Sequence, residues 1–99
     1  MIEIFFARVR MAPLSVLLTD YDGTLAPFLI DRNAAVPYPG VTEALNGLRR
    51  SGRTEIEVVS GRPVAEVTTL LGMDPAPEIW GAHGWECRTA DGKKKIFPV

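Results

Sequence analysis

An apolar run that ends in two closely spaced aspartates constrains this chain more than any other feature. Residues 14–19 are mostly apolar, and Asp20 and Asp22 follow directly, with Tyr21 between them. An apolar run of this kind is typical of a parallel strand that is buried on both faces. Residues i and i+2 of an extended chain point to the same side, so the two carboxylates share one side at the end of a strand. Carboxylates this close repel each other unless a divalent cation lies between them or one of them holds a proton.

Helical and strand-like patterns alternate along the chain after this run. Residues 26–39 hold three prolines and few periodic apolar residues, so we expect a long loop, and long loops in compact domains are often functional. The patterns that follow predict a helix over 40–52, a strand over 55–59, a helix over 63–72 and a short strand over 79–81. This order is typical of a doubly wound α/β domain with a parallel, Rossmann-like sheet.

The apolar residues of the two predicted helices fall at the spacing of a single buried stripe. In the first helix they are Val41, Ala44, Leu45 and Leu48, and in the second they are Val64, Val67 and Leu71. We expect both stripes to pack against the sheet.

The two ends of the chain depart from this alternation. The first ten residues include an apolar patch at positions 4–7, and they are interpreted as a short strand or an upstream extension. Residues 85–98 predict a hairpin, because the Asp91-Gly92 pair near its centre is a strong hairpin signal.

Composition excludes several classes of protein. The chain has 99 residues, which allows one small domain at most. Its net charge of −1 gives no basic footprint for nucleic acid. No apolar run approaches the roughly 20 residues that cross a membrane. We therefore expect no membrane partner. The single cysteine, Cys87, fits a reducing compartment, so we expect a cytoplasmic location. The sequence carries no sign of an oligomeric state.

Polar residues follow each predicted strand, at the edge where parallel sheets bind their ligands. Asp20 and Asp22 follow the first strand, Ser60 ends the second, and His83 lies just beyond the third. A carboxylate at such a place can attack phosphorus and form an aspartyl-phosphate. Hard oxygen ligands of this kind suit Mg²⁺.

Candidate phosphate ligands lie close to these carboxylates in the sequence. Gly23 lets the backbone approach an anion closely, and we expect the amides of Gly23 and Thr24 to hold phosphate oxygens. Ser60 and Gly61 precede a predicted helix N-terminus, which is a natural phosphate site.

Several of these segments resemble a known family. Residues 20–25 (Asp-Tyr-Asp-Gly-Thr-Leu) are similar to the first motif of the haloacid dehalogenase superfamily of phosphohydrolases, and residues 58–60 are similar to its second motif. A finer similarity joins residues 20–27, 59–62 and 81–86 to the trehalose-6-phosphate phosphatase branch. The resemblance covers about residues 14–99.

The resemblance implies roles for particular residues. Asp20 is implied as the nucleophile and Asp22 as the general acid and base, with Mg²⁺ bound by the Asp20 carboxylate and the Asp22 backbone carbonyl. Arg62, His83 and Glu86 are implied to lie beside the entrance for a sugar-phosphate substrate.

The resemblance also implies a division of the chain. Residues 1–13 are an N-terminal extension, residues 14–84 form the first half of the phosphatase core, and residues 85–99 begin a cap domain that recognises the sugar. The resulting fold class is a partial doubly wound sheet of the haloacid dehalogenase type with the start of a cap.

The sequence departs from the family pattern in one respect. The family has a phosphate-binding lysine and a later acidic cluster, and this sequence contains neither, since Lys93, Lys94 and Lys95 lie beside the hairpin turn. We therefore expect the N-terminal part of a phosphatase, marginally stable and inactive by itself, in which the first strand is an exposed edge. The alternatives are another capped sugar phosphatase, acting on sucrose phosphate or mannosylglycerate phosphate, and an inactive fragment or phosphate-binding module.

Overall fold

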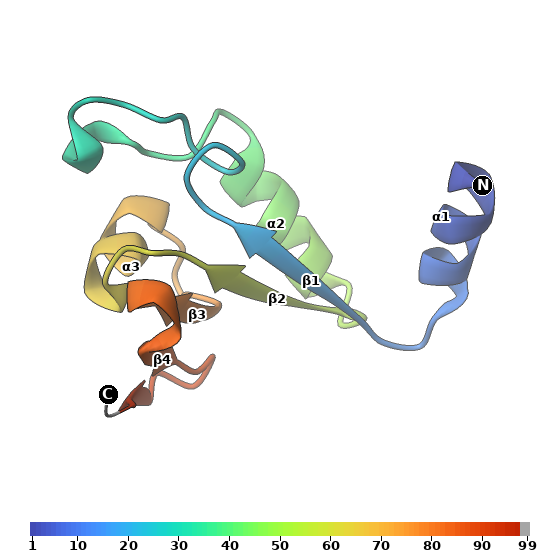
Figure 1. Cartoon of the computed structure of the whole chain (residues 1–99). Helices are drawn as coiled ribbons and strands as arrows, with labels where there is room; N and C mark the ends of the chain where they lie inside the picture. The colour runs from blue at the N-terminus through green and yellow to red at the C-terminus, as the bar shows by residue number, and fades with distance from the viewer. Residues whose placement is uncertain (98–99) are drawn as a thin grey trace.

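The computed structural model describes residues 1–97, which form a five-stranded sheet with two helices on one face and a third helix standing apart (Figure 1). In chain order the elements are α1 (Ile2–Met11), β1 (Ser15–Asp20), the 3-10 helix η1 (Arg32–Ala34), α2 (Val41–Arg50), β2 (Thr54–Val59), α3 (Val64–Leu71), β3 (Glu78–Gly81), the 3-10 turn η2 (Ala82–Gly84), β4 (Glu86–Arg88) and β5 (Lys94–Ile96).

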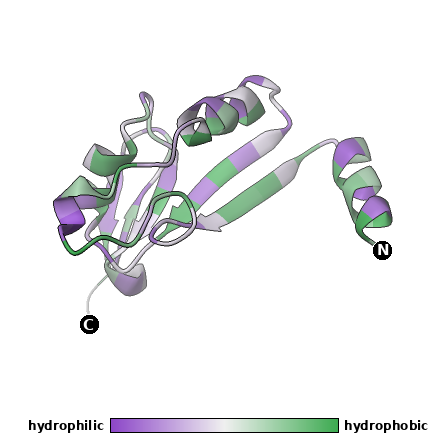
Figure 2. Cartoon of the chain, turned by 90° about the horizontal axis from the view of Figure 1, so that it is seen from above, coloured by the Kyte–Doolittle hydropathy of each residue, from purple (hydrophilic) through white to green (hydrophobic). Residues whose placement is uncertain are grey.

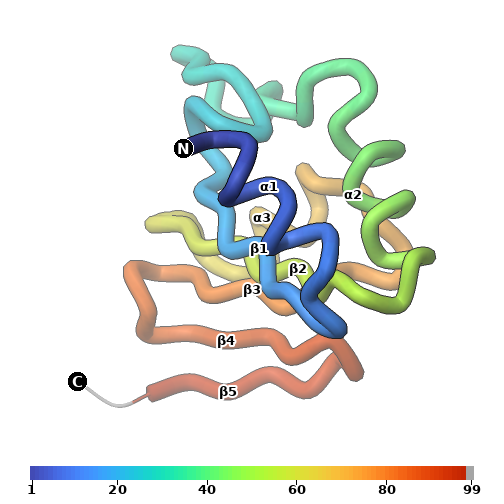
Figure 3. Tube along the Cα trace, turned by 90° about the vertical axis from the view of Figure 1, so that its right-hand side faces the viewer, coloured from blue at the N-terminus to red at the C-terminus, as the bar shows by residue number. Residues whose placement is uncertain are grey.

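The strands lie in sequence order, β1-β2-β3-β4-β5. The first three are parallel, with Asp20 beside Val59 and Val59 beside Trp80, which confirms the predicted parallel α/β arrangement. The predicted hairpin is also confirmed over the described residues, and β4 and β5 continue the same sheet in antiparallel pairing (Figure 3). The assignment of residues 85–99 to a cap stays a prediction, and residues 98 and 99 lie outside the described range.

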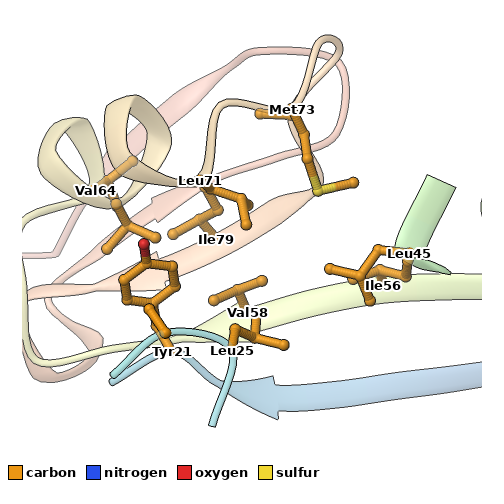
Figure 4. Close-up of a cluster of buried hydrophobic side chains, with 12 residues drawn as sticks. Tyr21, Leu25, Leu45, Ile56, Val58, Val64, Leu71, Met73 and Ile79 are labelled. Atoms are coloured by element: carbon orange, nitrogen blue, oxygen red, sulfur yellow. The ribbon is translucent and has the colours of Figure 1, made fainter. Parts of the chain in front are cut away.

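The core lies between the sheet and the two helices α2 and α3 (Figure 4). Tyr21, Val58 and Ile79 have no exposed surface, and burying an aliphatic side chain such as Val58 or Ile79 stabilises a fold by roughly 1.5–3 kcal/mol. The predicted stripe of α3 is confirmed, since all three of its residues are buried.

The stripe predicted for α2 is only partly buried. Leu45 is buried and Val41 packs against the core, whereas Ala44 and Leu48 are exposed. Part of the α2 stripe is exposed because α2 packs on β2, near one edge of the sheet. Only one strand, the outermost on that side, lies beyond β2.

β1 is that outermost strand. Val16 is 52% exposed and Leu18 is 62% exposed, so the expectation of a strand buried on both faces was wrong. The exposed edge expected for the first strand is confirmed. Leu17 lies beside Ile56, a core residue, so Val16 and Leu18 project from the face opposite the two packed helices.

The first residues form a helix, so the short-strand alternative was wrong, and their assignment to an N-terminal extension over 1–13 stays a prediction. The apolar residues Ile2, Phe5, Phe6 and Val9 recur at helical spacing, and the continuous patch at 4–7 conceals this period. None of the residues of α1 is buried, and Figure 2 shows the helix away from the rest of the chain. Among the helices over residues 1–97, none is long and apolar enough to cross a membrane.

Candidate active site

The carboxyl ends of β1 and β2 bring Asp20 and Ser60 to one edge of the sheet. Asp20 lies beside Val59 in the parallel register, and Ser60 is the next residue after Val59. Asp20 is exposed, and its carboxylate accepts a hydrogen bond of 2.8 Å from the backbone amide of Tyr21. The arrangement leaves a carboxylate open to solvent at the place where parallel sheets bind ligands.

Tyr21 anchors the turn that carries the two aspartates. Its side chain is fully buried, and its hydroxyl donates a 2.5 Å hydrogen bond to the carbonyl of Ala35 in the long loop. Burial raises the pKa of this phenol, which keeps it a neutral donor. The carbonyl of Tyr21 accepts hydrogen bonds from the amides of Leu25 and Ala26, which closes a tight turn over residues 21–26.

Asp22 is bound by the guanidinium group of Arg62, 40 residues further along the chain. Nε of Arg62 lies 3.1 and 2.9 Å from the two carboxylate oxygens, and Nη2 lies 2.8 Å from one of them. The hydrogen bonds from Arg62 lower the pKa of Asp22, and the same bonds raise the pKa of Arg62. Asp22 is therefore an ionised carboxylate in this conformation.

Arg62 is buried beside Asp22, and its expected place at a substrate entrance stays a prediction. Its side chain is only 4% exposed, and Nη1 donates to Glu66 at 2.5 Å and to the carbonyl of Arg32 at 2.9 Å. Sequence reasoning missed Glu66, although its i, i+4 spacing from Arg62 is a signal for an ion pair. The guanidinium thus joins the first loop to α3.

The amides expected to bind phosphate already have acceptors. Gly23 donates to the carbonyl of Ala26 at 2.7 Å, and Thr24 donates to the carbonyl of Tyr21 at 3.2 Å. The ring of Phe28 lies against the α-carbon of Gly23, where a β-carbon would overlap it, and φ of Gly23 is +81°. The positive φ favours glycine at this position. Phosphate binding by these two amides stays a prediction.

Ser60, Gly61 and His83 form the other side of the edge. The Ser60 hydroxyl accepts a 3.0 Å hydrogen bond from the amide of Arg62, and the Ser60 carbonyl accepts from the amide of His83 at 3.3 Å. The exposed His83 imidazole covers Gly61 so closely that a β-carbon there would lie 2.6 Å from the ring. His83 has a left-handed φ of +55°, which orients the ring over this glycine.

Glu86 holds the N-terminus of α3. Its carboxylate accepts a 2.9 Å hydrogen bond from the amide of Val64, the first residue of that helix. Negative charge is favourable at this end of a helix. The helix N-terminus that follows Ser60 and Gly61 therefore already holds a carboxylate, and a substrate-side role of Glu86 stays a prediction.

A cavity of about 320 Å³ adjoins Asp22 and is lined by Phe28, Leu29, Arg32 and Arg62. Within residues 1–97, no three acidic, histidine or cysteine side chains gather in a way that could hold a metal ion. The Asp20 carboxylate is the one of the pair that is free of Arg62, so Asp20 fits a hard cation as one of several oxygen ligands. The second expected ligand, the backbone carbonyl of Asp22, stays a prediction.

Comparisons with known proteins agree with this geometry. Residues 18–97 match the family described as trehalose-phosphatase. A trehalose-phosphate phosphatase of Mycobacterium avium is 43% identical over 75 residues, which cover 74% of this chain and 18% of that protein. One from Mycobacterium tuberculosis is 44% identical over the same length and also covers 18% of that protein. The chain thus spans less than a fifth of these relatives.

Solved structures share the fold. The C-terminal domain of trehalose-6-phosphate phosphatase from Candida albicans superposes with a TM-score of 0.84 and 24% identity, over 95% of this chain and 32% of that one. Trehalose-6-phosphate phosphatase from Aspergillus fumigatus gives a TM-score of 0.79 and 28% identity, over 91% of this chain and 34% of that one. A phosphatase of the haloalkanoate (HAD) superfamily from Bacteroides thetaiotaomicron gives 0.67 and 25% identity, over 88% of this chain and 30% of that one. On the match that spans residues 18–97, this chain belongs to the trehalose-phosphatase family.

Proposed function

We propose that this chain carries the phosphate-transfer residues of a phosphatase that converts trehalose 6-phosphate into trehalose and phosphate. The observation that carries the proposal is the parallel register of β1 and β2, which puts Asp20 and Ser60 at one edge with Asp22 two residues further on. The trehalose-phosphate phosphatases among the relatives, at 43–44% identity, support the choice of substrate.

The reaction follows from the two carboxylates. An oxygen of Asp20 attacks phosphorus, and the bond between phosphorus and the sugar oxygen breaks. Asp22 gives a proton to that leaving oxygen and then takes one from the water that attacks the aspartyl-phosphate, which releases phosphate and restores Asp20. Ser60 holds a non-bridging oxygen through its hydroxyl.

The hydrogen bonds from Arg62 impose a condition on this sequence of steps. Asp22 is ionised while Arg62 holds it, and an ionised carboxylate cannot protonate a leaving group. Asp22 has to leave Arg62, or lose part of that contact, before the first proton transfer. We expect substrate binding beside Asp20 to favour that change, because a phosphate dianion raises the pKa of a neighbouring carboxyl group.

Mg²⁺ is proposed as the cofactor, held through Asp20 and the backbone carbonyl of Asp22. It screens the negative charges of nucleophile and phosphate from each other. The open Asp20 carboxylate supports this choice, and further oxygen ligands are needed to complete the coordination shell. The proposed enzyme acts in the cytoplasm, in line with the single cysteine and the absence of an apolar run long enough for a membrane.

A chimeric enzyme tests the proposal. Residues 14–97 of this chain replace the matching segment of the M. tuberculosis relative, and phosphate release is measured with trehalose 6-phosphate, sucrose 6-phosphate and mannosylglycerate phosphate. We expect turnover with trehalose 6-phosphate and its loss, by at least about 10³-fold, in the Asp20→Asn variant. Glu43→Gln, a matched change on the exposed side of α2, serves as control. Near-normal turnover by the Asp20→Asn chimera, or turnover with another substrate only, rejects the proposal.

A further inference from the structure

We propose that the groove between α3 and the β4–β5 hairpin is a second anion site, which binds the phosphate group of a small molecule away from the edge where β1 and β2 end. The groove is a cavity of about 360 Å³, and its charged lining residues are Arg88 of β4 and Lys94 of β5. We call it the hairpin groove and define it by these two residues together with Thr68 and Thr69 of α3. It shares no residue with the proposed active site, so the inference does not depend on the proposed function.

Two cations lie directly opposite each other in the hairpin. Arg88 pairs with Lys94 of β5 and, on its other side, with Ile79 of β3. Ile79 is a core residue on the face that α3 covers, and partners on neighbouring strands point to the same face, so both cations project toward α3. Like charges in directly opposed positions destabilise a pair of strands. An anion bound between the two cations removes this repulsion.

No carboxylate among the described residues neutralises these cations. The ion pairs found within residues 1–97 all involve other groups. The two acidic residues of the hairpin have other hydrogen-bond partners, since Glu86 accepts from the amide of Val64 and Asp91 accepts from the hydroxyl of Thr89. The hairpin groove therefore keeps its positive charge in this part of the chain.

The guanidinium of Arg88 has donors left for a ligand. Nη1 lies 3.5 Å from the carbonyl of Ala76 and 3.4 Å from the carbonyl of Thr89, at the outer limit of a hydrogen bond. Over residues 1–97, neither Nε nor Nη2 of Arg88 donates a hydrogen bond. A guanidinium presents its donors as a planar fork that matches two oxygens of a phosphate group.

α3 supplies the opposite wall of the hairpin groove. Thr68 and Thr69 lie three and four residues after Ala65, so all three share one face of the helix, and all three line the cavity. The two hydroxyls donate to carbonyls one turn earlier in the helix, at 2.8 and 3.0 Å. Such bonds add little to the stability of a helix, so each hydroxyl can turn its proton toward an anion at small cost.

These groups suit a phosphate group better than a carboxylate. A phosphate monoester carries about two negative charges and three free oxygens, which two cations and two hydroxyls can bind together. A carboxylate carries one charge and two oxygens. The cavity volume of about 360 Å³ lies near the lower end of the range for small-molecule sites, which favours a small phosphorylated molecule or free phosphate.

Titration of the ¹⁵N-labelled 99-residue chain tests the inference. Backbone amide shifts are recorded with sodium phosphate, with glucose 6-phosphate and, at equal ionic strength, with sodium chloride. We expect a saturable response at Thr68, Thr69 and Arg88 to the two phosphates only. The double change Arg88→Gln and Lys94→Gln should weaken binding at least about tenfold, because each substitution removes a charge-assisted hydrogen bond.

The matched control is Lys93→Gln with Lys95→Gln, which removes the same charge from the same hairpin at two residues outside the cavity lining. We expect this control to weaken binding less than about threefold, since it acts only through the general charge of the hairpin. Neither double change should unfold the chain, because both reduce repulsion between cations, and the dispersion of the amide spectrum checks this.

The outcomes separate a phosphate site from ordinary surface charge. A saturable response to either phosphate that depends on Arg88 and Lys94 supports the hairpin groove, and the tighter of the two probes shows whether a sugar phosphate or free phosphate is preferred. No saturable response, an equal response to chloride, or equal weakening by the two double variants overturns it. A response confined to amides around Ser60 also overturns it, since phosphate would then bind at the proposed active site alone.

Discussion

Two neighbouring strands of the same sheet have opposite environments. Val58 in β2 has no exposed surface, whereas Val16 in the adjacent parallel strand β1 is 52% exposed. Both strands contain β-branched and aliphatic residues, but Val58 lies on the face that the helices cover, whereas Val16 lies on the opposite face. β2 has a strand on each side and helices on one face, and β1 has one neighbour. Burial in this fold is therefore decided by the elements that cover a side chain and not by its hydrophobicity alone.

Truncating one side chain in each region gives the largest expected contrast. Ile79→Ala removes a fully buried side chain from β3 and should lower the free energy of unfolding by about 2–5 kcal/mol. Leu18→Ala removes a side chain that is 62% exposed and should cost less than about 0.5 kcal/mol. Urea denaturation followed by circular dichroism measures both. Equal losses would mean that Leu18 is covered in solution, for example by association of chains.

Replacing a buried and an exposed arginine extends the contrast to charge. Arg62→Met leaves Asp22 and Glu66 without their partner and should cost about 2–3 kcal/mol, since both carboxylates keep part of their hydration. Arg53→Met breaks the contact with the end of α1 and should cost less than about 1 kcal/mol, because that contact is exposed. The measurement is again the free energy of unfolding, at neutral pH.

Acidification checks the cause of the Arg62 effect. Arg62 lowers the pKa of Asp22 in the folded chain, so the pair stabilises the fold above the ordinary pKa of an aspartate. That stabilisation is lost as pH falls through the lowered pKa. We expect the difference between the native chain and Arg62→Met to be full at neutral pH and to shrink in strong acid. A difference that does not change with pH would point to lost packing.

Patterns between close neighbours in the sequence predicted much of the fold. The helical stripe that ends at Leu71, the Asp91-Gly92 turn and the parallel strands that carry Asp20 and Ser60 all depend on local spacing. The fold class and the grouping of Asp20 with Ser60 followed from these patterns, because parallel strands end at a common edge.

Pairings across long separations could not be predicted in the same way. Nothing near Asp22 in the sequence indicates that its partner is Arg62, and nothing near Glu86 indicates that it holds the N-terminus of α3. The exposure of Val16 likewise depends on which face of the sheet the helices cover. The short apolar patch at 4–7 was ambiguous because helix and strand both accommodate a run of that length.

Removing one hydroxyl from the core should have a moderate effect. Tyr21→Phe leaves the buried carbonyl of Ala35 without its donor and should cost about 1–2 kcal/mol. Tyr38→Phe, at a residue that is 46% exposed, is the matched control and should change stability by less than about 0.5 kcal/mol. Thermal or urea unfolding compares the two. A negligible effect at Tyr21 would show that water replaces the hydroxyl.

The smallest expected difference lies between two glycines. Gly23 and Gly40 have similar left-handed φ angles of +81° and +88°, so alanine at either position should cost about 1–2 kcal/mol through the backbone. A β-carbon at Gly23 also meets the ring of Phe28, whereas at Gly40 it meets nothing within 4 Å. Phe28 is 79% exposed, so its ring can rotate away, and the two alanine variants should differ by less than about 0.5 kcal/mol. Gly23→Ala could instead prove far more costly than Gly40→Ala, with the additional cost disappearing when Phe28→Ala is combined with it. Phe28 would then be fixed in place over the loop that carries Asp22. An exposed side chain would then behave like a core residue, and the contrast between β1 and β2 would not extend to the loop that carries Asp22.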